Sequence, residues 1–483
     1  MSDGKRLYFT IVIFSFICTI FMGINYLYNN QIVTLLYTLL LLLLSNILFT
    51  FTNIKYYIVN LIFYITLFVF LVIRPTIDLI REGILDLYQV DVYKTAFVLL
   101  IVAILGLMIG SFLVPKRIEN ENKPKSVSNE LLNKNIRKVS LFIFSISYPM
   151  YLIRLVERLV YRMNHSYYDY YSNFKSSLPY ITYTISSFMI YAMCIFLATK
   201  PGKKESTFIL SLFVLANCIN LLIGVRNPFV LSIIFAFLYY FLRNQEEKGL
   251  WLGLKEKFVL YLGTPLLMIV MGIINYTRDN LSVRQMTFVD IILDFLYKQG
   301  VSFGVLTRGY LYSSNLPVRD FSSFTFNPLI EYFSFSNIGL IFGVTPYTTN
   351  SNSIELALHS NRYAHNLSYI VMGGDYLQGH GLGSSYIMEI YTDFGVLGLF
   401  LFSLVLGVLF IFMVKTAYTA SVLKFSMTLI VFVNLFFMPR SSFFESFLNL
   451  FTVQFWGSVL IIYMGARLIT KKISNISVHE RRE

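Results

Sequence analysis

The chain has 483 residues, of which 56% are hydrophobic and 13% charged, and its mean hydropathy is +0.65. Soluble domains carry about 25% charged residues, so this composition excludes a cytosolic enzyme, a secreted disulfide scaffold, a disordered chain and a nucleic-acid-binding protein. It indicates an all-α, polytopic membrane protein, and the net charge of +13 has to be explained within that class.

Apolar runs of about 20 residues predict helices that span the membrane, because backbone groups in hydrocarbon must be hydrogen-bonded within their own segment. The first run follows the N-terminus at once and is interpreted as a retained helix rather than a signal peptide. The twelve predicted spans are 8–26, 31–52, 56–73, 95–114, 139–156, 181–199, 207–225, 228–242, 258–276, 394–414, 425–438 and 446–466.

The charged residues predict how these spans are oriented. With the N-terminus inside, the predicted inner segments hold 24 of the 39 Lys and Arg residues but 10 of the 26 Asp and Glu residues. Cytoplasmic loops are enriched in Lys and Arg, and the clearest inner segment is 115–138. Both termini are therefore predicted to be cytoplasmic, and the positive charge is a signal of topology.

Residues 277–393 form a predicted outer loop that is too long to be a mere connection. Its apolar helical stretches, 288–297 and 302–312, indicate a partly helical extracytoplasmic cap. The chain then divides into a membrane region with nine spans (1–276), the cap (277–393), and a region with three spans and a cytoplasmic tail (394–483). No internal repeat is visible, which disfavours the inverted-repeat transporters.

Three arginines lie directly at span ends: Arg74, Arg226 in GVRNPF and Arg440 in MPRSS. Enrichment of basic residues on the inner side disfavours such positions on an outer face, so each requires a reason. One reason is snorkelling, or pairing with a nearby carboxylate. Another is the binding of a lipid-linked diphosphate, because a guanidinium matches phosphate oxygens in a bidentate way.

The segment 363–398 contains two of the five histidines and a series of glycines that permit tight turns. A histidine can act as a general base near neutral pH, so His365 is a candidate, although it could instead bind a backbone carbonyl or cap a helix. Glu389 is predicted to lie in a helix that follows these glycines, and Gly395 to break the chain before the next span.

Serines occupy positions typical of helix caps at two places. Ser384 or Ser385 can cap the helix that contains Glu389, and Ser442 and Glu445 have the spacing of a capping box before the last span. The chain has no P-loop, no Asp-x-Asp pair and no HExxH motif, and its three cysteines lie in apolar runs. No metal site or cofactor is therefore predicted, and energy for a synthesis would come from an activated lipid-borne donor.

The stretch GHGLGSSYIMEIYTDFGVLGLF at 379–400 resembles the pattern of the Wzy-type O-antigen and capsular polysaccharide polymerases. The pair His365 and Asn366 is similar to one in the related O-antigen ligases. GVRNPF and MPRSS fit the family's arginines outside a middle span and before the last span. The resemblance implies a GT-C-like helical fold in the bacterial cytoplasmic membrane.

The resemblance also implies a reaction. A growing glycan would pass from undecaprenyl diphosphate to a hydroxyl of a new lipid-linked repeat unit on the outer face, and the leaving lipid diphosphate makes a nucleotide, metal or cofactor unnecessary. The implied partners are the undecaprenyl-diphosphate-linked oligosaccharide and the lipid bilayer. A chain-length regulator and a flippase are further candidate partners, and nucleic acid is not one.

Physical chemistry then gives the predicted residues their roles. Arginines would neutralise the diphosphate as the glycosidic bond breaks. The predicted diphosphate-binding residues are Arg226, Arg440, Arg278 and Arg284. His365 and Glu389 are the candidate catalytic bases for the acceptor hydroxyl, and Glu389 could equally be a structural residue of its helix.

Two alternatives use the same topology. An enzyme similar to the O-antigen ligases would perform the same chemistry on a different acceptor. A flippase or exporter of lipid-linked oligosaccharide would need polar residues along a central path, and the apolar spans contain few of them. It would also have no use for an outer loop of more than a hundred residues.

Overall fold

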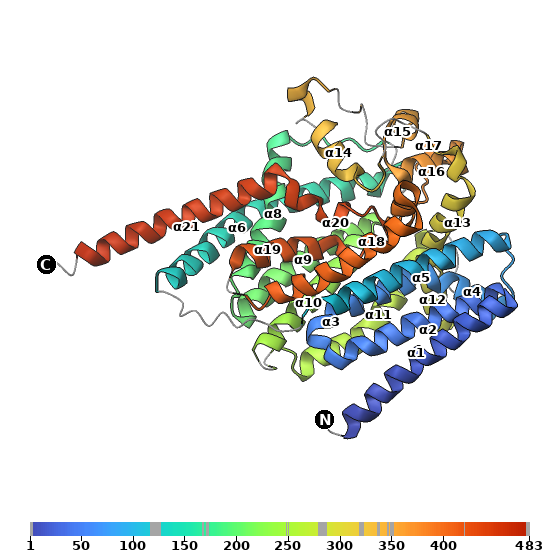
Figure 1. The fold of residues 1–483 in the computed structure, drawn as a ribbon. Coiled ribbons are helices and arrows are strands. Elements are labelled where there is room, and N and C mark those ends of the chain that lie inside the picture. The colour runs from blue at the N-terminus through green and yellow to red at the C-terminus, as the bar shows by residue number, and fades with distance from the viewer. Residues whose placement is uncertain are drawn as a thin grey trace.

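The fold is described from a computed structural model, which covers residues 3–115, 127–166, 169–170, 173–247, 249, 251–278, 287–317, 323–335, 339–344, 347, 352–419 and 421–479. Every regular element in these ranges is helical (Figure 1). The α-helices are α1 (Asp3–Asn29), α2 (Ile32–Thr50), α3 (Ile54–Leu67), α4 (Ile73–Glu82), α5 (Val90–Leu113), α6 (Val127–Asn164), α8 (Tyr180–Ala198), α9 (Lys203–Ile223), α10 (Asn227–Glu246), α11 (Leu254–Arg278), α12 (Phe288–Gln299), α13 (Phe303–Leu311), α14 (Asn327–Ser334), α15 (Ile354–His359), α16 (Tyr363–Met372), α17 (Gly374–Leu377), α18 (Tyr386–Thr416), α19 (Val422–Leu435), α20 (Glu445–Leu448) and α21 (Val453–His479). Shorter turns are η1 (Phe51–Asn53), η2 (Phe68–Val72), η3 (Gly300–Ser302), η4 (Ser313–Asn315), η5 (Gly339–Phe342), η6 (Met438–Arg440) and η7 (Asn449–Phe451).

Each of the twelve predicted spans overlaps an α-helix, although the last, 446–466, crosses α20 and η7 before it enters α21. Nine helical runs in the described part of the chain are long and apolar enough to cross a membrane, so the protein is a polytopic helical membrane protein. One of the nine, Ile32–Glu82, contains two of the predicted spans. Two predicted spans are not among the nine: α19 has 14 residues, and α10 is polar at both of its ends.

The helices run side by side, with both chain ends at one end of the bundle and α14 to α17 at the other (Figure 1). The two helical stretches expected in the 277–393 loop are present as α12 and α13. They pack against α4, α5 and α11, so this part of the loop joins the bundle. Residues 116–126 of the predicted inner segment lie outside the described residues.

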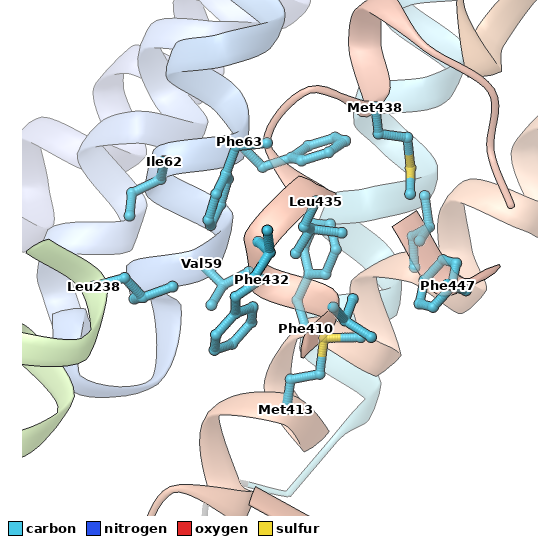
Figure 2. Close-up of a cluster of buried hydrophobic side chains, with 14 of the residues drawn as sticks. Val59, Ile62, Phe63, Leu238, Phe410, Met413, Phe432, Leu435, Met438 and Phe447 are labelled. Carbon is cyan, nitrogen blue, oxygen red and sulfur yellow. The ribbon is translucent and has the colours of Figure 1, made fainter. Parts of the chain in front are cut away.

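Apolar side chains fill the centre of the bundle, where α3, α10, α18 and α19 meet (Figure 2). Phe63 of α3 and Phe410 of α18 lie with their ring centroids 5.0 Å apart, and both are fully buried. Contacts of this kind hold helices together in lipid, where close packing replaces the hydrophobic effect.

Small residues bring α5 and α18 unusually close. A Cβ placed on Gly110 would lie 2.0 Å from the carbonyl oxygen of Leu404, and one on Gly407 would lie 2.2 Å from that of Leu107. Only a hydrogen fits at these positions, which is the usual device for close contact between membrane helices. This contact fixes the position of α18, whose first turns carry part of the site described below.

The predicted break at Gly395 is confirmed. Gly395 has φ +66° and ψ −167°, which interrupts the helical backbone inside α18. Side chains with a Cβ rarely adopt this conformation. The residues before the break, from Tyr386 to Phe394, therefore point in a different direction from the span that follows. Asp393 fastens them to the loop by accepting hydrogen bonds from the Ser323 hydroxyl at 2.9 Å and the Thr325 amide at 2.8 Å.

Candidate functional site

A polar cavity of about 810 Å³ lies among the elements at the end of the bundle that carries α14 to α17. Segments far apart in the sequence build it: α14, the start of α16, the end of the glycine-rich stretch, η6 and α20. Its polar and charged lining residues are Asn327, Glu331, Tyr332, Tyr347, Arg362, Tyr363, His365, Ser384, Arg440, Ser441, Ser442 and Glu445. Two residues predicted from the sequence, His365 and Arg440, thus meet in one cavity.

The local sequence explains how the glycine-rich stretch reaches this cavity. Gly383 has φ +80°, in the left-handed region that favours glycine, and it turns the chain just before Ser384. The Ser368 hydroxyl of α16 accepts a hydrogen bond from the Leu382 amide at 2.9 Å. Gly383 and Ser384 therefore lie near α16, and they line the same cavity as His365.

His365 is half-buried, and its Nδ1 lies 2.7 Å from the hydroxyl of Tyr376. The Tyr376 hydroxyl also lies 3.3 Å from both the amide nitrogen and the carbonyl oxygen of Ser353. When Tyr376 donates its proton to the Ser353 carbonyl oxygen, Nδ1–H of His365 donates to Tyr376, and Nε2 carries the lone pair. His365 can act as a base at Nε2 in this tautomer.

Electrostatics keep the His365 ring neutral. Burial, reinforced by the Arg362 guanidinium, lowers the pKa of His365 to about 4. Asn366, the second member of the pair, plays a different part. Its side-chain amide donates to the carbonyl oxygens of Ala357 and Ser360, which ties α16 to α15. Of the two neighbours, His365 therefore faces the cavity and Asn366 supports its wall.

Two carboxylates that the sequence did not place in the site also line the cavity. Glu331 of α14 pairs with the Arg362 guanidinium, and burial nevertheless raises the pKa of Glu331. Burial likewise raises the pKa of Glu445 at the start of α20. The spacing of Glu445 next to MPRSS suggested a capping box, which accounted for it without a cavity. For Glu331 and Arg362 the separation of 31 residues gave no local signal.

Glu389 lies behind the cavity wall rather than in it. It is fully buried, and its carboxylate accepts hydrogen bonds from the Ser384 hydroxyl at 2.6 Å, the Ser442 hydroxyl at 2.6 Å and the Phe443 amide at 3.2 Å. The expected capping box is wrong in this respect, because the Ser442 hydroxyl binds Glu389 and the N-cap of α20 is Phe444. Glu389 thereby joins the start of α18 to the segment before α20.

Arg226 lines a second cavity, of about 300 Å³, at the N-terminus of α10. Pro228 begins that helix in its first turn, as predicted. This Arg226 cavity is otherwise almost entirely apolar and contains side chains from α3, α10, α11 and α12. The Arg226 cavity adjoins the polar cavity, since Phe437 lines both. In addition, the ring centroid of Phe70, which lines the Arg226 cavity, lies 6.0 Å from the guanidinium carbon of Arg440.

The other two predicted diphosphate-binding arginines cannot be placed in either cavity. Arg278 is the last residue of α11, and the structure describes its backbone but not its side chain. Arg284 lies outside the described residues. Within those residues, no group of three or more His, Cys, Asp or Glu side chains is placed to hold a metal ion.

Together these features define a polytopic helical membrane protein with a charged cavity beside an apolar one, and the comparisons agree with this class. The family model for O-antigen polysaccharide polymerase Wzy matches residues 11–473, nearly the whole chain. The chain therefore belongs to the Wzy family of O-antigen polymerases. No curated protein and no solved structure matches it significantly.

Proposed function

We propose that this polymerase transfers a growing glycan from undecaprenyl diphosphate to a hydroxyl of a new lipid-linked repeat unit. The reaction would take place on the outer face of the bacterial cytoplasmic membrane, with both termini in the cytoplasm. The positions of the chain ends and of α14 to α17 at opposite ends of the bundle support this orientation. The sorting of basic residues to the predicted inner segments supports it independently.

The observation that carries the proposal is the adjacency of the two cavities across Phe437. A lipid-linked oligosaccharide has an isoprenoid chain, a diphosphate and sugars in that order. The apolar Arg226 cavity suits the first part of the chain and the polar cavity suits sugars, and we assign Arg226 and Arg440, one from each lining, to the diphosphate. The order of the two cavities thus matches the order of the parts of the donor.

In the proposed reaction the acceptor oxygen attacks the anomeric carbon of the donor sugar. The new C–O bond forms, the bond to the diphosphate breaks, and the electron pair leaves with the lipid diphosphate. Nε2 of His365 takes the proton of the acceptor hydroxyl, which its low pKa leaves it free to do. Arg226 and Arg440 stabilise the charge that grows on the leaving oxygen. Glu389 acts by positioning Ser384 and Ser442 in the cavity wall.

The test replaces the two arginines one at a time. Arg226→Ala and Arg440→Ala should remain inserted in the membrane but abolish polymer, so that a deletion strain carrying either variant displays single repeat units. Removing one preorganised charge-stabilising group typically costs about 10²–10³ in rate. The matched control is Arg81→Ala, since Arg81 is an exposed arginine of α4 that lines neither cavity.

Normal polymer from both cavity variants would refute the proposal. A loss of polymer in Arg81→Ala as well would mean that the assay reports general damage. If deletion of the gene instead leaves long polymer that is not attached to its final acceptor, the ligase-like alternative replaces the polymerase.

A further inference from the structure

A third cavity, of about 450 Å³, lies on the outer surface of α18 beyond the break at Gly395. Its lining is entirely apolar and includes Phe326, Leu401, Val405, Phe443, Phe444 and Phe447. We call it the aromatic cavity. Leu401 and Val405 are each 50% exposed, so the cavity faces the surroundings of the helix bundle, where the lipid chains of a bilayer would lie.

The aromatic cavity and the polar cavity share a thin wall. In the segment that leads into α20, Ser442 and Glu445 line the polar cavity, whereas Phe443 and Phe444 line the aromatic one. The same alternation occurs at the start of α14, where Phe326 faces the aromatic cavity and the following residue faces the polar one. A lipid chain in the aromatic cavity therefore has the polar cavity on the other side of these short segments.

The wall is built of packed rings. The centroids of Phe326 and Phe444 are 4.8 Å apart, and those of Phe443 and Phe447 are 5.7 Å apart. Phe443 and Phe447 are buried, and the amide of Phe443 also binds Glu389. The rings are thus held in place by the same contact that positions the polar cavity, which gives a preformed surface for an apolar chain.

Charge distinguishes the aromatic cavity from the Arg226 cavity. A lipid whose diphosphate leaves during the reaction needs cations near its head, and the lining of the Arg226 cavity supplies one in Arg226. The lining of the aromatic cavity contains no charged side chain. A lining without charge suits a lipid that keeps its diphosphate throughout the reaction.

We propose that the aromatic cavity binds the isoprenoid chain of the acceptor, the new lipid-linked repeat unit; this rests on the proposed polymerase function. The polymerase needs two lipid-linked substrates at once, and the polar cavity is flanked by two apolar ones. Donor and acceptor chains then enter from different sides, and their sugars meet in the polar cavity. Each isoprenoid chain then has its own binding cavity, so the enzyme distinguishes donor from acceptor although both carry the same lipid.

The experiment separates the two substrates chemically, using the full-length protein in lipid nanodiscs. The donor is the native lipid-linked repeat unit with its accepting hydroxyl blocked. Two acceptors carry the same oligosaccharide, one on a C55 isoprenoid and one on a short, water-soluble alkyl chain. Val405→Trp fills the aromatic cavity, and Ile461→Trp is the control, because Ile461 is similarly exposed on α21 and lines none of the three cavities.

Val405→Trp should raise the KM for the C55 acceptor about tenfold, since loss of about two buried methylene groups costs that much affinity. The KM values for the donor and the short-chain acceptor should stay unchanged, as should all three values in Ile461→Trp. A C55 acceptor with a photoreactive group in its chain should label the peptide around residues 401–409 in the unaltered protein. The labelling supplies the answer if Val405→Trp fails to fold.

Other outcomes overturn the inference. A higher KM for the donor would assign the aromatic cavity to the donor and leave the polymerase function standing. Unchanged KM values, or labelling elsewhere, would mean that only ordinary membrane lipid occupies the cavity. If the unaltered protein transfers no glycan to either acceptor, the proposed function itself fails, and the inference fails with it.

Discussion

Acidification tests the assignment of His365 most directly. The base must be unprotonated to take the proton of the acceptor, and burial together with Arg362 holds its pKa at about 4. Activity should therefore be almost constant from neutral pH down to mildly acidic pH, and fall only as the pH approaches 4. An ordinary solvated histidine would lose activity through its usual pKa of 6.5.

The difference is large enough to measure at pH 5.5. A histidine with a pKa of about 4 is about 97% neutral there, whereas one with a pKa of 6.5 is about 9% neutral, a tenfold difference in competent enzyme. The same shift affects stability. Because the folded pKa lies below the unfolded one, the stability contributed by His365 is complete above pH 6.5 and is lost as the pH falls through 6.5 toward 4.

The assay measures the initial rate of transfer in nanodiscs as a function of pH, for the unaltered protein and for a variant with its nearest ion pair neutralised. Changing Arg362→Gln together with Glu331→Gln removes the second cause of the shift without leaving a buried charge unpaired. The pH at which the rate falls on the acid side, called the acid limb, should rise from about 4 by part of the interval to 6.5. Glu445→Gln controls for the other carboxylate in the cavity and should leave the limb in place.

Three results would refute the reasoning. An acid limb near 6.5 in the unaltered protein would show that the base is a solvated histidine or another group. An acid limb at the same pH in the Arg362/Glu331 variant would show that Arg362 does not lower the pKa of His365. A limb abolished by Glu445→Gln would make Glu445 the titrating group and leave His365 a supporting residue.

Two further substitutions test the scaffold that holds the site. Gly110→Ala should lower the apparent Tm of the solubilised protein, at a cost in stability of about 1–3 kcal/mol or more, because the new methyl group meets the Leu404 carbonyl. Gly457→Ala on α21 is the control and should leave the Tm unchanged, because nothing lies within 4 Å of its new methyl group. Equal Tm values for the two variants would contradict the packing argument. Glu389→Ala should reduce the yield of folded protein, since two buried donors, the Ser384 hydroxyl and the Phe443 amide, lose their acceptor at about 1–3 kcal/mol each. Glu389→Gln should fold and polymerise with the loss of one hydrogen bond, and a folded but inactive Glu389→Gln would instead favour Glu389 as the base.

Much of the fold could be predicted because the membrane imposes it. Hydrocarbon requires long apolar helices, so each predicted span overlaps a helix. The length of an apolar stretch was a weaker guide to which helices belong to the bundle, because α10 and α19 are part of it although their apolar stretches are short. The break at Gly395 followed from its residue type, whereas the close approach of α5 and α18 depends on which glycines face each other across the sequence.

The site could be predicted only where a residue type is unusual at its position. Arg440 at a span end and His365 in a glycine-rich stretch were both conspicuous, and both line the polar cavity. Glu331 and Arg362 were not, because an acidic and a basic residue in a long loop usually face water. Their pairing arises from the fold of α14 onto the start of α16. The sequence could not decide between the two roles of Glu389, which depend on what surrounds its carboxylate.

The electrostatics of the polar cavity link binding of the leaving group to activation of the acceptor. The lining of the polar cavity contains two arginines, Arg362 and Arg440, and burial together with Arg362 keeps His365 unprotonated. The His365 ring is therefore neutral at mildly acidic pH, at which a solvated histidine with a pKa of 6.5 would be partly protonated. In the proposed reaction the negative charge of the donor diphosphate would raise the proton affinity of His365 when the donor is bound. The same arginines would then bind the leaving group and favour proton transfer from the acceptor to His365.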